Sequence, residues 1–144
     1  MNLNLNGLTA LVTASTGGIG LEIARSLAIE GARVIVNGRT QSNVEKALTE
    51  LRRDLSSADL VGLAADNGTV GGCATTLSTW PQVDILVNNL GIYEAIGFFD
   101  ETDGAWQKMF EINIMSGVRL ARQYLKGMLE RGHGRLVFIS SESG

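Results

Sequence analysis

The sequence predicts an α/β fold in which a mostly parallel sheet carries helices on both faces. Apolar, β-branched-rich runs alternate with amphipathic helical patterns along the chain. The apolar runs are nearly continuous, as expected for strands that are covered on both sides. No repeat, low-complexity tract or proline-rich linker divides the 144 residues. We therefore expect a single domain over residues 1–144.

Five runs have the length and composition of buried strands. They cover residues 8–14, 32–37, 60–65, 83–89 and 135–140. Because a helical pattern separates each pair of runs, right-handed crossovers should join parallel strands. In such a sheet, ligands bind outside the carboxyl ends of the strands, at the point where the strand order reverses. The residues that follow each strand are therefore the first candidates for a site.

Helical periodicity predicts the elements between the strands. The patterns run over residues 19–30, 42–55, 70–79 and 102–131. The second pattern opens with the capping-box spacing of Ser42 and Glu45. The last pattern predicts one or two helices that are interrupted near 113–117 and end at Gly132.

Composition and charge exclude several classes of function. The formal net charge is −3 and no long basic run is present, so neither nucleic acid nor an anionic membrane is an expected partner. The amino terminus lacks the pattern of a signal peptide and no stretch approaches a membrane span, which predicts a cytoplasmic protein. Cys73 is the only cysteine, so we expect a packing residue and no metal site.

The loop TASTGGIG, residues 13–20, follows the first predicted strand and leads directly into a helix. Backbone N–H groups at a helix start are unpaired and partly positive, so a loop bare of side chains lets a diphosphate approach them. The pattern predicts a nucleotide site, although a close strand-to-helix turn alone would also need glycines. The candidate cofactor-binding residues here are Ser15, Thr16, Gly18, Ile19 and Gly20.

This loop resembles the Thr-Gly-x-x-x-Gly-Ile-Gly element of the short-chain dehydrogenases/reductases. Gly18, Ile19 and Gly20 match it, whereas Ala14 stands where the first glycine is usual. If position 14 needs a left-handed backbone, alanine costs roughly 1–2 kcal/mol there. The resemblance spans the whole chain and implies a Rossmann-like, doubly wound dinucleotide-binding domain.

The end of the second strand, VIVNGRT, bears on the choice of cofactor. Proteins that bind NAD usually place a carboxylate here for the ribose 2′-hydroxyl. Asn37 or Gly38 takes that place, and the Arg39 guanidinium could pair with a 2′-phosphate. We therefore favour NADP(H) over NAD(H), with Arg39 as an ordinary solvated residue being the alternative. Gly17 argues against this choice, because many NADP-using relatives carry a second basic side chain there.

Two further strand ends match elements of the family. Asp66 stands where the family's acidic residue binds the adenine amino group, and Asn67 follows it; an aspartate that caps a turn would look the same. The segment from Asn88 resembles the family's Asn-Asn-Ala-Gly, with leucine at position 90 in place of alanine. The resemblance implies that Asn89 and Gly91 lie against the ribose, and paired asparagines can also tie strands together.

Two candidate catalytic residues rest on the same resemblance. Ser141 matches the serine whose hydroxyl binds the substrate oxygen, and Asn113 matches the asparagine that holds a water in the proton relay. In a plainer interpretation, Ser141 caps a turn and Asn113 breaks a helix. The family's Tyr-x-x-x-Lys pair is absent, because neither Tyr93 nor Tyr124 is followed four residues later by lysine. The resemblance therefore implies an amino-terminal portion that is truncated after the fifth strand.

The expected function is hydride transfer between NADP(H) and a ketone or secondary alcohol, with a lean towards the 3-ketoacyl reductases from the segment HGRLVFISS. The alternative is a nucleotide-binding module without catalysis, since this stretch alone lacks the proton donor. The fold does not fix the reaction, so other chemistry stays open.

The expected partners are a small carbonyl or alcohol substrate and further copies of the chain. The resemblance implies a homodimer or homotetramer formed through the helices of residues 105–131, with Phe110, Leu120, Tyr124 and Leu125 among the residues available. The aromatic loop that starts at Tyr93 either lines the substrate pocket or packs into the core. The fifth strand should present an exposed apolar edge.

Overall fold

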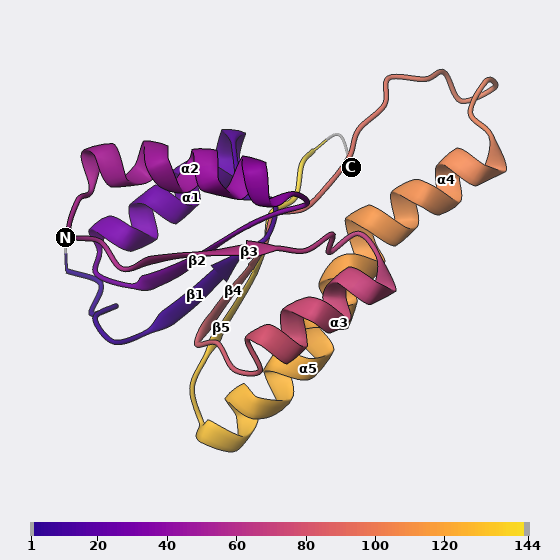
Figure 1. Ribbon diagram of the computed structural model, residues 1–144. Coiled ribbons are helices and arrows are strands. Elements are labelled where there is room, and N and C mark those ends of the chain that lie inside the picture. The colour runs from indigo at the N-terminus through magenta and orange to yellow at the C-terminus, as the bar shows by residue number, and fades with distance from the viewer. Residues whose placement is uncertain (1, 143–144) are drawn as a thin grey trace.

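The structure is a computed structural model that describes residues 2–142, so the ends of the predicted domain, residues 1, 143 and 144, lie outside it. Five parallel strands form one sheet in the order β3-β2-β1-β4-β5 (Figure 1). The strands are β1 (Thr9–Val12), β2 (Arg33–Gly38), β3 (Leu60–Ala64), β4 (Ile85–Asn88) and β5 (Arg135–Phe138). The predicted α/β, Rossmann-like fold is confirmed, and its strand order reverses between β1 and β4.

The helices cover both faces of the sheet. They are α1 (Gly18–Ile29), α2 (Gln41–Asp54), α3 (Val70–Thr79), α4 (Asp103–Phe110), the π-helical segment η1 (Glu111–Met115) and α5 (Ser116–Arg131). Helices α1 and α2 lie on one side of the sheet, and α3 and α5 lie on the other (Figure 1). Each predicted helix is present within one residue of its expected ends, apart from the division of the last pattern.

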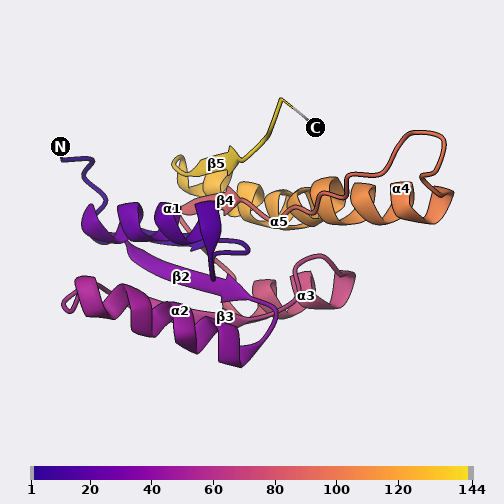
Figure 2. The same cartoon turned by 90° about the horizontal axis from the view of Figure 1, so that it is seen from above.

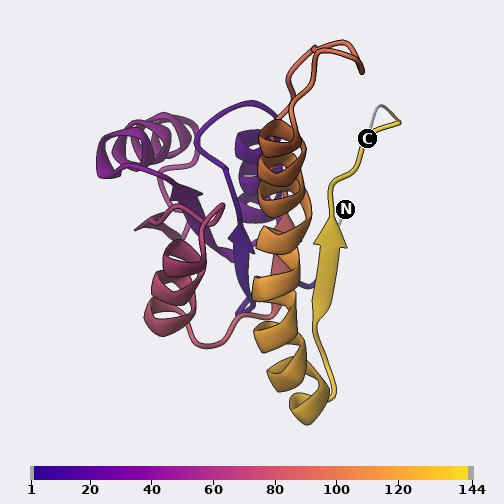
Figure 3. The ribbon, with the colours of Figure 1, turned by 90° about the vertical axis from the view of Figure 1, so that its right-hand side faces the viewer.

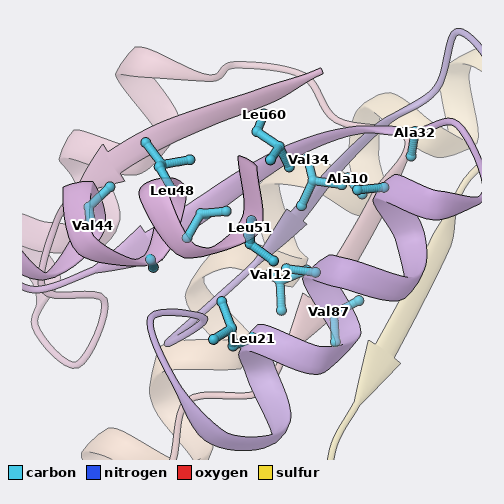
Figure 4. Packing of buried hydrophobic residues seen from close by; sticks show 14 of the residues in the cluster. Ala10, Val12, Leu21, Ala32, Val34, Val44, Leu48, Leu51, Leu60 and Val87 are labelled. Carbon is cyan, nitrogen blue, oxygen red and sulfur yellow. The ribbon is translucent and has the colours of Figure 1, made fainter. Parts of the chain in front are cut away.

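Two apolar cores hold these layers together. Val34 and Val36 of β2 face α1 and α2, where they belong to one cluster with Val44 and Leu51 (Figure 4). Ile35 between them faces the other way and belongs to the second cluster. Because alternate side chains of a strand point to opposite faces, a strand covered on both sides must be apolar at every position.

The second core corrects part of the predicted subunit interface. Leu120 and Tyr124 of α5 are buried in the cluster beneath the sheet, with exposed fractions of 0% and 2%. Both side chains therefore pack within the chain and cannot meet another copy. Phe110 and Leu125 are exposed, as such an interface would need.

The start of α2 also differs from its prediction. Thr40 is the N-cap, and its side chain accepts a hydrogen bond from Asn43 N at 3.3 Å. Ser42 therefore lies inside the helix rather than before it. Glu45 bonds the Gln41 amide instead of closing a capping box, so that prediction was wrong by two residues.

The long pattern of residues 102–131 forms two α-helices that are interrupted at Glu111–Met115, close to the predicted 113–117, although the backbone stays helical throughout. Figure 2 shows α4 and α5 as one rod that extends beyond the sheet. The two helices are joined by the π-helical turn η1, which has Asn113 at its centre. A π-turn inserts one extra residue without breaking the helix and is frequent at functional sites. Gly132 ends α5 with φ +76°, as predicted.

Strand β5 stands at the edge of the sheet (Figure 3). Within residues 2–142 it pairs with β4 on one side only. Val137 and Phe138 are 41% and 54% exposed, which confirms the predicted apolar edge.

Candidate nucleotide-binding site

The glycine loop between β1 and α1 is fastened to the end of β4. Thr13 is buried, and its Oγ1 accepts hydrogen bonds from the backbone N–H groups of Asn89 and Leu90, both at 3.0 Å. The Asn89 side chain returns the contact, because its Nδ2 donates to the carbonyl oxygens of Thr13 and Ala14 at 3.1 Å each. As the paired asparagines suggested, Asn89 ties the two neighbouring strand ends together.

Ala14 adopts a left-handed backbone with φ +49°. A left-handed backbone was considered above for this position, where the family usually has glycine. A Cβ in this region lies close to the following carbonyl, so the loop carries roughly 1–2 kcal/mol of strain at Ala14. The surrounding hydrogen bonds of the loop hold it there.

The amino terminus of α1 is not capped by a side chain. Its N-cap residue, Gly17, is extended, with φ −173°. Gly17 and Gly18 are exposed, and a Cβ on either residue would meet no heavy atom within 4 Å, so the space beside the start of the helix is open. The starts of α2, α3 and α4 are instead capped by Thr40, Thr69 and Thr102.

Gly20 serves a different purpose from the glycines before it. A Cβ at this position would lie 2.5 Å from both Ala14 O and Asn89 Nδ2. The absence of a side chain therefore lets α1 approach β1 and β4 closely. Ile19, one residue earlier, is 67% exposed at the mouth of the loop.

Ser15 faces the interior rather than the loop surface. Its Oγ donates to Val12 O at 2.7 Å and accepts from Asn37 N at 2.9 Å, and the residue is fully buried. Its side chain shapes the loop, and only its backbone remains for a ligand. Thr16 is half-buried beside Gly38.

Asn37 resolves which residue stands at the end of β2. Its side chain points into the sheet, where Nδ2 donates to Leu63 O and Ala65 O at 3.1 Å. Its Oδ1 accepts from Ala14 N at 3.2 Å and from Asn67 Nδ2 at 3.0 Å. Gly38, and not Asn37, therefore occupies the place of the usual carboxylate.

The Asn67 side chain belongs to the same buried network. Its Oδ1 accepts from Thr76 Oγ1 at 2.6 Å, and the residue is 2% exposed. Its side chain is therefore occupied, and only its backbone is available to a ligand. This network was not predicted, although two asparagines at or near the ends of apolar strands could have indicated buried amides that need internal partners.

Two charged candidates lie on the surface at the carboxyl ends of β2 and β3. Arg39 is exposed, and its guanidinium makes no hydrogen bond or ion pair within residues 2–142. Asp66 is also exposed, and its Oδ1 accepts from Gly68 N at 3.0 Å. The turn-capping alternative therefore applies to one oxygen of Asp66.

Asn113 fastens the loop that follows β4. Its Oδ1 accepts from Ile92 N at 2.7 Å and its Nδ2 donates to Ile92 O at 2.9 Å. Gly91 lies beside this contact, since a Cβ there would be 3.4 Å from Asn113 Oδ1. The π-turn of η1 aims the Asn113 amide at this loop.

Ser141 follows β5 and is exposed. The pairing of β5 with β4 continues past the strand, because Ile139 N donates to Asn88 O at 2.9 Å. Ser141 therefore leaves the sheet at the edge where β1 and β4 also end. Asn88 Nδ2 is buried at this edge and has no hydrogen-bond partner in the described part of the chain.

The aromatic loop after β4 does not pack into the core. Tyr93, Phe98 and Phe99 are 73%, 75% and 96% exposed, and the two phenylalanine rings contact each other edge to face. Of the two predicted roles for this loop, the core contact was wrong. A role in lining the substrate pocket stays a prediction.

The remaining reactive side chains are buried structural groups. The Cys73 thiol donates to Asn67 O at 3.2 Å, and burial raises its pKa, which fits the predicted packing role. The Tyr124 hydroxyl donates to Trp80 O at 2.7 Å, and burial raises its pKa as well. Across residues 2–142, no three His, Cys, Asp or Glu side chains are grouped as metal ligands would be, and no helix has the length and apolarity to span a membrane.

Comparison with known proteins places these elements among oxidoreductases. The family described as short chain dehydrogenase matches residues 8–144. The uncharacterized oxidoreductase YvaG of Bacillus subtilis is 53% identical over 99% of this chain and 54% of that protein. The chain spans about half the length of the curated relatives it matches.

Solved structures show the same likeness. L-sorbose reductase from Gluconobacter frateurii, complexed with NADPH and L-sorbose, superposes with a TM-score of 0.89 at 32% identity, over 99% of this chain and 55% of that one. Actinorhodin polyketide ketoreductase with NADPH gives 0.82 at 37% identity, over 98% of this chain and 55% of that one.

Proposed function

The chain belongs to the short-chain dehydrogenase family, and from this premise we propose that it binds NADP(H) at the glycine loop as part of a carbonyl reductase or alcohol dehydrogenase. The observation that carries the proposal is the bare start of α1. No side chain caps its first N–H groups and Gly17 and Gly18 are exposed, whereas three other helices begin with a threonine cap. A diphosphate supplies the acceptors that these N–H groups lack.

The residues around the loop fit a dinucleotide. Gly17 and Gly18 leave space in front of the helix, and Gly91 and the Asn89 backbone lie at the neighbouring strand end. Asp66 retains an oxygen for the adenine amino group. The Ser15 and Asn67 side chains act indirectly, by holding the backbone of the loop and of the third strand end in place.

Arg39 supports NADP(H) over NAD(H). Its guanidinium is exposed and unpaired in the described part of the chain, directly after the glycine that replaces the usual carboxylate. A guanidinium matches a phosphate through two parallel N–H bonds, and no carboxylate at position 38 repels the 2′-phosphate. L-Sorbose reductase and the actinorhodin ketoreductase, both solved with NADPH, are in keeping with this choice.

For the reaction, we assign the substrate contact to Ser141 and a positioning role to Asn113. The bound nicotinamide supplies or accepts the hydride. Ser141 leaves the sheet at the ligand-binding edge, where its hydroxyl could donate to a carbonyl oxygen and polarise it. Asn113 holds the loop that starts at Gly91 through both atoms of its amide.

The proton donor of the reaction lies outside residues 1–144 in this proposal. Tyr124 is buried and bonded to Trp80 O, and Tyr93 sits on the exposed loop. The stretch described here then binds the cofactor and contacts the substrate, and it does not complete catalysis by itself. The substrate class is a ketone or secondary alcohol, with polyketides and sugars suggested by the names of the actinorhodin ketoreductase and L-sorbose reductase.

We further propose that α4 and η1 meet a second copy of the chain. Trp106, Phe110 and Ile114 are about half exposed and are spaced four residues apart, which places them on one helical face. Sedimentation of the wild-type protein and of Phe110→Glu tests this assignment. We expect the substitution to shift a dimer or tetramer towards the monomer.

The nucleotide assignment is tested by titrating the protein with NADPH and with NADH, using cofactor fluorescence. We expect tighter binding of NADPH. Arg39→Asp should weaken NADPH by about tenfold or more, since it removes a charge-assisted contact, while NADH changes little. Arg122→Asp, an exposed arginine of α5, is the matched control. Equal binding of the two cofactors, or an equal effect of both substitutions, would contradict the assignment.

A further inference from the structure

The end of β2 is packed against the glycine loop at one point, between Gly38 and Thr16. A Cβ on Gly38 would overlap with Thr16 Cγ2 and would lie 3.3 Å from Val44 Cγ2. Carbon atoms in contact prefer separations of about 3.5–4.0 Å. A side chain at position 38 therefore requires the Thr16 side chain to shift.

Thr16 cannot move aside easily. Its Cβ carries two heavy atoms, so few χ1 rotamers are available to it. Its other branch, Oγ1, already lies 3.4 Å from the Cβ position of residue 38. The preceding residue, Ser15, is fixed by hydrogen bonds to Val12 O and Asn37 N.

Position 38 is the place where a carboxylate would act on cofactor choice. An acidic side chain at the end of the second strand accepts bonds from a ribose 2′-hydroxyl and repels a 2′-phosphate. The backbone of β2 is compatible with a side chain here, because Gly38 does not have a positive φ. The Thr16 methyl group is the main obstacle to a carboxylate at position 38, and Val44 Cγ2 limits the space on another side.

We infer that Thr16 is a specificity-determining residue, which keeps the end of β2 bare so that Arg39 alone faces the 2′ position of the cofactor. The inference rests on the proposed function, because it concerns the choice between two nucleotides. It predicts that positions 16 and 38 change together: a cofactor switch at position 38 requires a smaller residue at position 16.

The test is a double-mutant cycle with Thr16→Ser and Gly38→Asp. Serine removes Cγ2 and keeps the hydroxyl, so the Tm and the two nucleotide affinities of Thr16→Ser are the reference against which the double variant is compared. Gly38→Asp alone should lower the Tm by roughly 5–10 °C, as overpacking of a tight contact does in a domain of this size. The double variant should recover most of that loss.

Nucleotide titration gives the second readout. The double variant should bind NADH about tenfold or more tightly than NADPH, whereas Gly38→Asp in the threonine background should bind both weakly. Gly38→Ala with and without Thr16→Ser repeats the stability cycle without a new charge, and it serves if Gly38→Asp fails to fold.

Two outcomes would overturn the inference. If Gly38→Asp is as stable as the wild type and prefers NADH without any change at position 16, then Thr16 does not control this position. If the wild-type protein binds neither nucleotide, the proposed function fails and selection by Thr16 fails with it. In that second case the alanine cycle still tests the contact between residues 16 and 38. If Thr16→Ser restores the Tm that Gly38→Ala loses, but no nucleotide binds, then the contact is one of packing and has no role in specificity.

Discussion

Helix α1 and helices α2, α3 and α4 begin in opposite ways. Each of the latter three places a threonine hydroxyl on an N–H group of its first turn, whereas α1 begins at a glycine with nothing to cap it. A threonine cap is worth about 1 kcal/mol to a helix. Helix α1 therefore lacks a stabilising contact that the other three helices have. Its start lies where the strand order of the sheet reverses, between β1 and β4.

The largest expected effect comes from filling the close approach behind that bare start. Gly20→Ala places a methyl group 2.5 Å from Ala14 O and Asn89 Nδ2. Overpacking costs typically 1–3 kcal/mol, and we expect about 3 kcal/mol here because one of the two atoms belongs to the backbone. Urea unfolding followed by circular dichroism measures the loss. The control is Gly17→Ala, whose Cβ meets nothing within 4 Å, and equal losses would contradict the packing argument.

The second effect comes from giving α1 the cap that it lacks. Gly17→Asp places a carboxylate beside the open N–H groups, where it competes with a diphosphate. We expect NADPH to bind about tenfold more weakly or worse, while the helix gains a few tenths of a kcal/mol. Isothermal titration and thermal unfolding measure the two sides. Gly71→Asp, in the exposed first turn of α3, should leave NADPH binding unchanged, and a loss there would show that charge alone explains the result.

The third effect comes from removing a cap elsewhere. In Thr102→Ala, α4 loses the hydrogen bond from Ala105 N at 3.2 Å. The free energy of unfolding should fall by about 1 kcal/mol, with no change in NADPH affinity. Thr102→Ser keeps the hydroxyl and should retain most of the stability. A loss of nucleotide binding in the alanine variant would contradict the expectation that the start of α1, and not the start of α4, binds the nucleotide.

The smallest effect sharpens the comparison within the loop itself. Ala14→Gly relieves a left-handed alanine with φ +49°, and we expect a gain of about 0.5–1 kcal/mol after the greater flexibility of glycine is subtracted. This corresponds to a rise in Tm of roughly 2–4 °C. Ala24→Gly, in the middle of α1, should change stability in the opposite direction. A Tm that does not rise would show that the loop relaxes around Ala14.

The fold could be predicted from the sequence because its signals are local. Continuous apolar strands and helical periodicity repeat along the chain, and the glycine loop follows the first strand. The helix cap was placed at Ser42 instead of Thr40 because both residues can cap, and only the backbone angles of Thr40 decide between them. Leu120 and Tyr124 were assigned to an interface because the rotation of α5 against the sheet is not visible in a one-dimensional pattern.

The details of the candidate site were less accessible. Whether Asn37 or Gly38 faces a ligand depends on carbonyl groups in β3 and directly after it, which lie 26 and 28 residues away. The contact between Thr16 and Gly38 joins two loops that only the folded sheet brings together. The roles of Arg39, Asp66, Asn113 and Ser141 towards ligands stay predictions.

The grip of Asn89 on the carbonyl groups of Thr13 and Ala14 spans 76 and 75 positions of sequence. During synthesis, the glycine loop emerges long before Asn89 does. A peptide that ends before β4 contains every glycine of the loop but lacks the Asn89 side-chain amide that bonds to two of its carbonyl groups. We therefore expect nucleotide binding to appear only when the fourth strand packs beside the first. It should not increase step by step as each strand and helix is added.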